Sequence, residues 1–196
     1  MDKKDRTRIL ILAAAKRVFL EKGYKDTTIK LIAESAGLGY GTIYSHFKLG
    51  KEEVFATLIE EVMTPFYEIA QLTYTPRNKE QAYNFTYNNT YKYLTLAIQN
   101  KEIFKLIHEA KGMSELVNQK WEDITDKFIE RISVNVEIVR SLGMIRNEHY
   151  HSEIVASFLY YLGERYLWEL ILDKTAIPIH EITRDIVTMY THGLFK

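Results

Sequence analysis

The side chains with the clearest chemical use are hydroxyl and imidazole groups gathered in one short segment, residues 40–46. Only Ile43 and Phe47, spaced at i and i+4, are suited to fix a helix here to a core. Hydroxyl and imidazole groups can hydrogen-bond phosphate oxygens and base edges. A short helix that packs through two residues and displays such groups is typical of the second element of a helix-turn-helix. The displayed groups would be Tyr40, Thr42, Tyr44, Ser45 and His46.

The residues before this segment predict the first helix of the motif and its turn. The Thr27 hydroxyl can accept a hydrogen bond from a backbone N–H group at the start of the helix. Gly37 can adopt the left-handed conformation that ends the helix. Between them, apolar residues recur at helical spacing, namely Ile29, Ile32, Ala33 and Ala36. The segment therefore predicts two short helices joined by a tight turn, with DNA binding as their function.

Charge is distributed unevenly along the chain. The formal net charge is zero, which alone argues against nucleic-acid binding. However, residues 1–51 carry eleven Lys and Arg against five Asp and Glu, whereas residues 52–196 carry fifteen against twenty-one. A basic head on an acidic body is expected when only the head meets phosphate.

Four motifs follow one another around the turn: Ile-Leu-x-Ala-Ala-x-x-x-Phe at 11–19, Gly-Tyr-x-x-Thr-Thr at 23–28, Ile-Ala-x-x-Ala-Gly at 32–37 and Gly-Thr-Ile-Tyr-x-His-Phe at 41–47. Together they resemble the TetR (tetracycline-repressor-like) family of bacterial regulators over residues 6–64. The resemblance implies a three-helix DNA-binding domain, joined by a helix starting at Lys51 to a larger helical domain for ligand binding and dimerisation. It also implies a homodimer on a near-palindromic operator of double-stranded DNA.

Two features depart from the family pattern. Gly39 stands where a Ser or Thr usually caps the recognition helix, so the cap is weaker here. The spacing from Phe47 to Lys51 is one residue longer than usual. This makes Lys48 a competitor for the phosphate contact that the family pattern gives to Lys51.

Individual residues can be given expected roles on DNA. The resemblance implies that Thr42 and Tyr44 hydrogen-bond phosphates. Thr28 and the helix N-terminus beside it would hold the backbone through unpaired N–H groups, and we expect Tyr40 and Ser45 to reach base edges. The full predicted DNA-binding set is Thr28, Gly39, Tyr40, Gly41, Thr42, Tyr44, Ser45, His46, Lys48 and Lys51.

Beyond residue 51 the pattern is helical throughout, which predicts an all-α protein. Only three prolines occur, and no apolar–polar alternation is long enough for a sheet. The expected domains are a helix-turn-helix DNA-binding domain at 1–50 and a ligand-binding and dimerisation domain at 51–196. The helices expected in the second domain are 51–74, 79–99, 101–111, 114–141, 152–173 and 179–194.

The last two expected helices are apolar over most of their circumference, so each must be buried on two sides. A second subunit is an economical cover for one of those sides, and the resemblance implies that these helices form a four-helix dimer interface. Burial by the chain's own core is the alternative. The predicted interface residues are Ile154, Phe158, Leu162, Ile182, Ile186 and Tyr190.

The middle of the chain is rich in tyrosine, whose buried phenols need hydrogen-bond partners. Aromatic residues at helical spacing form a plain core more often than a pocket, but apolar walls with a few polar groups are typical of a small-molecule site. We predict a hydrophobic effector, with an aromatic cation favoured and a fatty acid or acyl thioester as the alternative. The predicted lining is Tyr83, Tyr87, Tyr91, Phe104 and Trp121.

Other functions find little support in the sequence. Cysteine is absent, which excludes thiolate chemistry, and we expect no enzyme, cofactor or metal because no catalytic or ligand signature is visible. His149 and His151 alone are too few for a metal site. Without a signal peptide or a membrane-length apolar run, the leading interpretation is a cytoplasmic repressor released by its inducer. The alternatives are a small helical enzyme or carrier, and a head that binds protein partners.

Overall fold

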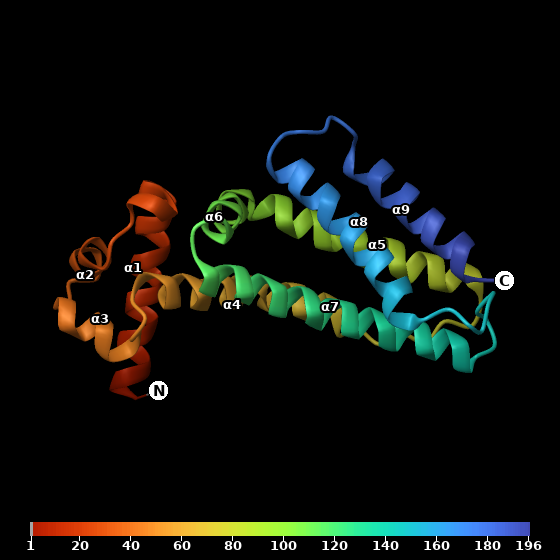
Figure 1. The fold of residues 1–196 in the computed structure, drawn as a ribbon, viewed down its shortest axis with the longest axis horizontal. Helices are drawn as coiled ribbons and strands as arrows, with labels where there is room; N and C mark the ends of the chain where they lie inside the picture. The colour runs from red at the N-terminus through yellow and green to blue at the C-terminus, as the bar shows by residue number, and fades with distance from the viewer. Residues whose placement is uncertain (1) are drawn as a thin grey trace. The chain divides into compact units, whose positions relative to one another are not determined.

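A computed structural model describes residues 2–196, and over these residues the chain is all-α, as predicted. Apart from an isolated bridge between Ile145 and Phe195, the described residues contain no β-structure. In chain order (Figure 1) the helices are α1 (Lys3–Asp26), α2 (Ile29–Ala36), α3 (Tyr40–His46), α4 (Lys51–Ala70), α5 (Lys79–Gln99), α6 (Lys101–Lys111), α7 (Glu115–Ser141), α8 (Ser152–Ile171) and α9 (Ile179–Leu194).

The predicted bounds of α5, α6 and α9 agree with the structure, whereas α4 and α8 end earlier than predicted. Arg131 explains the end of α4, because its guanidinium donates to the carbonyl oxygens of Ala70 (2.8 Å) and Leu72 (3.2 Å). These bonds satisfy carbonyls that have no partner within the helix. After α8, Asp173 adopts a left-handed conformation with φ 55°, which ends the helix.

By their internal contacts the residues form two compact units. Unit 1 comprises the described residues up to Thr64 together with Glu102–Glu122, and unit 2 comprises Pro65–Lys101 with Asp123–Lys196. The first division falls inside α4 at Pro65, which has no N–H to donate within the helix. The assignment of DNA binding to residues 1–50 and of ligand binding to residues 51–196 stays a prediction.

The core of unit 1 is built around Phe19, a fully buried residue of α1. Its ring stacks on Tyr24 at 5.8 Å between centroids and contacts Phe55 of α4 at 4.7 Å. Gly23 interrupts α1 just before Tyr24 with a φ of 80°, a conformation that glycine adopts at little steric cost. The other buried apolar residues of α1 are Ile11, Leu12, Ala14, Ala15 and Val18.

Thr28, and not Thr27 as predicted, is the N-cap of α2. The Thr28 Oγ1 accepts a hydrogen bond from the Leu31 N–H at 3.3 Å. The Thr27 side chain is buried instead, and its hydroxyl donates to the Gly23 carbonyl at 2.7 Å. Two adjacent threonines are equally suited to a cap, so only their burial distinguishes them. Gly37 ends α2 with a φ of 64°, as predicted.

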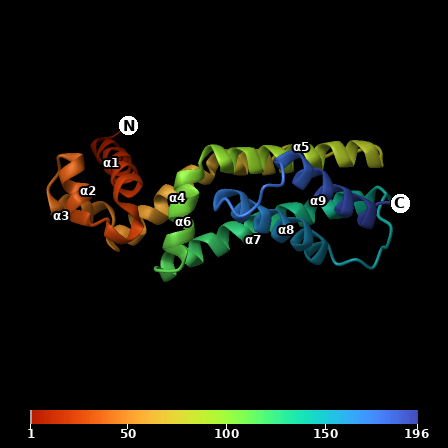
Figure 2. The ribbon, with the colours of Figure 1, turned by 90° about the horizontal axis from the view of Figure 1, so that it is seen from above.

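Unit 2 contains a helical layer in which α5, α8 and α9 pack on one another. Figure 2 shows α9 running beside both of the other two helices. One apolar cluster gathers residues from α5, α7, α9 and the adjoining loops: Tyr74, Ala82, Val136, Val139, Ile145, Tyr190, Leu194 and Phe195.

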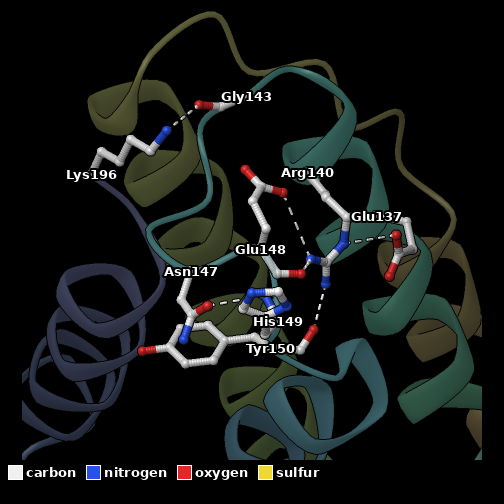
Figure 3. A network of polar contacts seen from close by, with 8 residues as sticks. All are labelled: Glu137, Arg140, Gly143, Asn147, Glu148, His149, Tyr150 and Lys196. Carbon is white, nitrogen blue, oxygen red and sulfur yellow. Dashed lines mark hydrogen bonds and ion pairs between the residues drawn. The ribbon is translucent and has the colours of Figure 1, made fainter.

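The loop between α7 and α8 is fastened by Arg140 (Figure 3). Its guanidinium donates to the carbonyl oxygens of Glu148 and Tyr150, and it pairs with the Glu137 carboxylate at 3.1 Å. Within the loop, the His149 N–H donates to the Asn147 Oδ1 at 3.0 Å. The loop that carries His149 is therefore ordered by an arginine at the end of α7.

Candidate functional site

The exposed face of α3 carries two phenols that touch each other. Tyr40 and Tyr44 are 55% and 39% exposed, although both are large aromatic residues. Their hydroxyl oxygens lie 3.3 Å apart and their ring centroids 5.1 Å apart. The hydrogen bond with Tyr40 raises the pKa of Tyr44. The Tyr44 phenol is therefore neutral near pH 7, and both side chains present their hydroxyl groups to solvent.

The opposite face of α3 is fixed by very few side chains. Ile43 and Phe47 are fully buried, as their spacing predicts. The Arg8 guanidinium lies 4.4 Å from the centre of the Phe47 ring and donates to the His46 carbonyl at 3.4 Å. A second N–H group of Arg8 donates to the Thr57 hydroxyl at 3.4 Å. Arg8 thus holds the C-terminal end of α3 against α1 and α4.

The remaining residues predicted on α3 have small or local roles. The Ser45 hydroxyl donates to the Thr42 carbonyl at 2.7 Å, within the helix. Gly39 gives α3 no side-chain cap, as predicted. Gly41 is exposed, and a Cβ at its position would meet nothing within 4 Å. Its surface is therefore open to a close approach by another molecule.

Tyr44 lies against the glycine of the insertion between α3 and α4. Gly50 has a φ of 67°, and a Cβ there would lie 3.4 Å from the Tyr44 phenol oxygen. The extra residue noted in the sequence therefore accommodates a left-handed turn beneath the Tyr44 ring. A side chain at Gly50 would be strained and would press on Tyr44.

The two lysines that compete for a phosphate contact differ in their surroundings. Lys48 is exposed between α3 and α4. The Lys51 Nζ instead donates to the carbonyl oxygens of Tyr24 (3.0 Å) and Lys25 (3.2 Å), and it lies 4.7 Å from the centre of the Tyr24 ring. Lys51 therefore already has a structural role at the end of α1, which favours Lys48 for a phosphate.

A cavity of about 120 Å³ lies within unit 2. Its wall is largely aromatic, and neighbouring rings contact each other: Phe66 and Tyr93 at 5.1 Å, Tyr93 and Phe128 at 5.5 Å, and Phe128 and Tyr160 at 5.9 Å between centroids. The lining residues are Phe66, Ile69, Ala70, Tyr74, Phe85, Thr86, Asn89, Thr90, Tyr93, Phe128, Arg131, Ile132, Asn135, Leu159, Tyr160, Gly163, Glu164 and Tyr190.

Two acceptors in this wall could serve a ligand, although its hydroxyl and amide side chains can both donate and accept. The Asn135 Oδ1 is buried without a hydrogen-bond partner, and the Glu164 carboxylate accepts from the Trp168 Nε1 at 3.3 Å. The one cation of the wall, Arg131, is engaged with the end of α4. Burial raises the pKa of Tyr160 and of Tyr190, so both phenols are neutral. A molecule that donates a hydrogen bond could therefore pair with the Asn135 Oδ1 or the Glu164 carboxylate.

The structure separates the aromatic residues that the sequence grouped into a pocket. Tyr83, Tyr87 and Tyr91 stack in a row on α5, with 6.1 Å between successive centroids, and none of them lines the cavity. Phe104 and Trp121 pack edge to face at 6.1 Å in unit 1 and are buried. None of the five predicted residues lines this cavity, and their role in ligand binding stays a prediction.

The cavity residues that the sequence did not single out share a pattern on α5. Thr86, Asn89 and Tyr93 line the cavity at successive intervals of three and four residues, with Thr90 beside Asn89, so they occupy one side of the helix. A mixed polar and aromatic stripe was thus visible in the sequence. The contributions of α7 and α8, such as Phe128 and Tyr160, depend on packing between distant segments.

The predicted dimer residues also divide into two groups. On α8, Ile154 and Phe158 are 67% and 50% exposed, and Leu162 is half-buried. On α9, Ile182, Ile186 and Tyr190 are buried within the chain, where α9 packs on α5 and α8. The predicted α9 residues are therefore covered within the chain, which is the alternative given above, and their role in a dimer stays a prediction.

Two other features limit the chemistry available. Among residues 2–196, no three His, Asp or Glu side chains gather as a metal site would require. Over the same residues, none of the helices has the length and apolar character needed to cross a membrane.

Known proteins resemble part of this sequence closely. The family described as "Bacterial regulatory proteins, tetR family" matches residues 11–58. The uncharacterised HTH-type transcriptional regulator YhgD of Bacillus subtilis (strain 168) is 48% identical over 56 residues, which are 27% of this chain and 29% of that protein. The HTH-type transcriptional repressor BepR of Brucella suis biovar 1 (strain 1330) is 32% identical over 117 residues, 59% of this chain and 51% of the repressor. The matches thus span about half or less of these relatives.

Similarity to solved structures extends over the whole chain. The structure of SmeT, the repressor of the Stenotrophomonas maltophilia multidrug efflux pump SmeDEF, has a TM-score of 0.75 and 22% identity, covering 100% of this chain and 93% of SmeT. The SmeT–triclosan complex has a TM-score of 0.78 and 21% identity, covering 97% and 92%. At this identity the likeness establishes the fold.

Proposed function

We propose that the chain is a transcriptional repressor that a small molecule releases from DNA, because residues 11–58 match the family described as "Bacterial regulatory proteins, tetR family" and 117 residues are similar to the repressor BepR. The observation that carries this proposal is the surface of α3. Its two apolar residues, Ile43 and Phe47, are fully buried, whereas Tyr40 and Tyr44 extend into solvent as a hydrogen-bonded pair. No core function explains two exposed phenols on so short a helix.

On DNA, α3 would enter the major groove and α2 would meet the backbone. Tyr44 and Thr42 would donate to phosphates, and Lys48 would add a charge contact. Tyr40 and Ser45 would reach base edges. Since α3 contains no Arg, Asn or Gln, bidentate base readout is absent, and specificity would depend more on apolar contacts and DNA shape.

The test of DNA binding is selection of duplexes from a random pool by the whole protein, followed by footprinting. We expect a near-palindromic site whose affinity falls as salt concentration rises. A selected pool without a common motif, or affinity that does not depend on salt, would contradict the proposal. A head that binds a protein partner instead of DNA would give the first of these results.

A second subunit would cover the exposed apolar face of α8. Ile154, Phe158 and Tyr161 are exposed there at i, i+4 and i+7, which places them on one side of the helix. Phe158→Glu should give folded monomers that bind operator weakly, because the new carboxylate would be buried in an apolar interface. Ile186→Glu is the matched contrast, since it should unfold the chain instead. Folded dimers of Phe158→Glu in light scattering would move the interface elsewhere.

The effector we propose is a small aromatic molecule with a hydrogen-bond donor, and an amine is favoured. A cavity of about 120 Å³ is close to that known to hold one benzene ring, about 150 Å³. Asn135 and Glu164 offer acceptors, and aromatic faces attract a cation. The complex of SmeT with triclosan supports an aromatic occupant in this fold.

An acyl effector has less support. Arg165 of α8 and Lys105 of α6 are cations with which an acyl carboxylate could pair. They pair with Glu169 (2.6 Å) and Glu102 (3.0 Å), and neither lines the cavity. An acyl carboxylate would therefore meet the acceptors of the wall without a cation ready to bind it.

Tryptophan fluorescence separates these effector classes. Trp168 reports on the cavity through its bond to Glu164, and Trp121→Phe removes the second indole. We expect saturable changes with benzylamine, weaker ones with benzyl alcohol and toluene, and none with octanoate. Operator release should follow the same order, and Asn135→Leu should reduce the preference for donors over toluene. Release by octanoate alone would contradict the proposal.

A further inference from the structure

Two oppositely charged side chains of unit 1 bind the backbone of Tyr24 and Lys25, at the end of α1 and just before α2. This two-residue segment is the α1–α2 junction. The N–H groups of Tyr24 and Lys25 donate to the two carboxylate oxygens of Glu109 on α6, at 3.4 and 3.1 Å. The carbonyl oxygens of the same two residues accept from the Lys51 Nζ on α4. Two successive residues are thus bound at both their donors and their acceptors.

Gly23 makes the approach of Glu109 possible. Its φ of 80° interrupts α1, so the N–H groups that follow cannot continue the pattern of the helix. A Cβ on Gly23 would lie 3.7 Å from the Glu109 Oε2, in van der Waals contact. Exposed N–H groups at such a break otherwise bind water. A carboxylate that binds two of them makes stronger, charge-assisted hydrogen bonds.

The helix that carries Glu109 begins among the elements that form the cavity. Lys101, its first residue, belongs to unit 2, and its Nζ lies 2.5 Å from the Asp173 Oδ1, just beyond the end of α8. Only Asn100 separates α6 from the end of α5. Both α5 and α8 contribute lining residues to the cavity. In the sequence, α6 thus follows directly on α5, and within unit 1 its Glu109 binds the Tyr24 and Lys25 amides.

We infer that Glu109 is a positioning residue that fixes the α1–α2 junction to α6, so that the placement of α2 depends on α6. The junction leads directly into Thr28, the N-cap of α2. A displaced α6 would therefore move the Tyr24 and Lys25 amides with it, rather than slide past them. This inference rests on the proposed DNA binding for its functional consequence, but its structural part does not need DNA.

The test compares Glu109→Ala with a control on the same helix, Glu102→Gln. Glu102 is exposed and pairs with Lys105, so the control removes one negative charge without touching the junction. Hydrogen exchange should be about tenfold faster at the Tyr24 and Lys25 amides of Glu109→Ala. Exchange should also rise at Leu31, whose N–H binds the Thr28 cap. The control should match wild type at all three amides.

Operator affinity gives the functional readout. Removing a negative charge near DNA should by itself strengthen binding. We nevertheless expect the selected operator duplex to bind Glu109→Ala about tenfold more weakly than Glu102→Gln, with the same salt slope. The reason is that only Lys51 would still hold the backbone of Tyr24 and Lys25, so α2 would be less well positioned for DNA. Glu109→Gln keeps the side-chain volume and one acceptor, so its effect should be intermediate. Glu109→Gln also allows the same comparison if Glu109→Ala does not fold.

Three outcomes would contradict the role of Glu109 or distinguish its failure from a failure of the proposed function. Unchanged exchange at Tyr24 and Lys25 in the folded variants would show that Glu109 does not hold the junction. Faster exchange at these two amides alone, with Leu31 and operator affinity as in the control, would restrict Glu109 to local stability. If wild type selects no duplex, the proposed function fails, and exchange at Leu31 still decides whether Glu109 positions α2.

Discussion

The surface of α3 and the cavity of unit 2 use tyrosine in opposite ways. On α3 the phenols of Tyr40 and Tyr44 are exposed and share one hydrogen bond. In the cavity wall the Tyr160 phenol is buried, and the Thr125 hydroxyl lies 3.2 Å away as its partner. An exposed phenol can always hydrogen-bond to water, so its capacity to contact DNA depends only on the position of its helix. A buried phenol depends on groups that other helices supply.

This difference makes the two regions sensitive to different changes. The position of α3 depends on Ile43, Phe47 and the contacts of Arg8. The cavity wall has contributions from α4, α5, α7, α8 and α9, so no single side chain determines it. Loss of one anchor should therefore displace or unfold α3. Loss of one side chain from the cavity wall should change the cavity and its stability only in part.

The largest effect is expected from an anchor. Phe47→Ala should lower the free energy of unfolding by about 3–5 kcal/mol, because it empties a fully buried ring site. Phe85→Ala, at the half-buried edge of the cavity, should cost about 1–2 kcal/mol because the wall is partly open already. Urea unfolding measures both values. Equal losses would contradict the contrast between a single anchor and a shared wall.

A smaller effect is expected from the exposed phenols. Tyr44→Ala should weaken operator binding by about 1–3 kcal/mol through the loss of a phosphate hydrogen bond. Thermal unfolding should be nearly unchanged, since the side chain is on the surface. Tyr160→Phe is the matched cavity variant and should leave operator affinity as in wild type. The contrast fails if both substitutions affect operator binding equally.

Alkaline pH distinguishes the regions through their buried tyrosines. Burial raises the pKa of Tyr74 and of Tyr190 in the folded chain, so the unfolded chain loses these protons first as pH rises. Each such group contributes stability fully below pH ~10 and loses about 1.4 kcal/mol per pH unit above it. Tyr190→Phe should flatten the decline in stability that unfolding measures between pH 9 and 11. A decline identical to that of wild type would refute this account.

The smallest effect concerns the two lysines near α3. Lys48→Ala should reduce the slope of log affinity against log salt by about one, as expected for one phosphate contact. Lys51→Ala should change the slope less and instead lower stability by about 1 kcal/mol, because its ammonium binds two carbonyls. Operator titrations at several salt concentrations measure the slopes. The reverse pattern would restore the family's usual role to Lys51.

Local features of the fold could be predicted from the sequence, and features assembled from distant segments could not. The spacing of Ile43 and Phe47 and the left-handed Gly37 depend on neighbouring residues alone, and both agree with the structure. The periodicity around Ile186 correctly indicates a buried face, but no local pattern says which chain covers it. The lining of the cavity depends on the packing of five helices.

Nearby residues that are equally suited to the same role also cannot be told apart from the sequence. Thr27 and Thr28 can each cap a helix, and only their burial distinguishes them. On α5, Tyr91 and Tyr93 are two residues apart, yet only Tyr93 lines the cavity. A rotation of about 200° separates them on the helix, and nothing in the sequence fixes which side faces inward.

The non-contiguous make-up of unit 1 has a consequence for exchanging parts between regulators. A fragment cut after residue 50 would keep α1 to α3 but lose Lys51 and Glu109, which bind the backbone at Tyr24 and Lys25. It would also lose Phe55, a neighbour of Phe19 in the core. A chimera that grafts only the first fifty residues onto another body would inherit unsatisfied amides and an open core. A transplant that works must carry residues 51–64 and 102–122 as well, so it is easier to change side chains on α3 of this chain than to exchange its whole head.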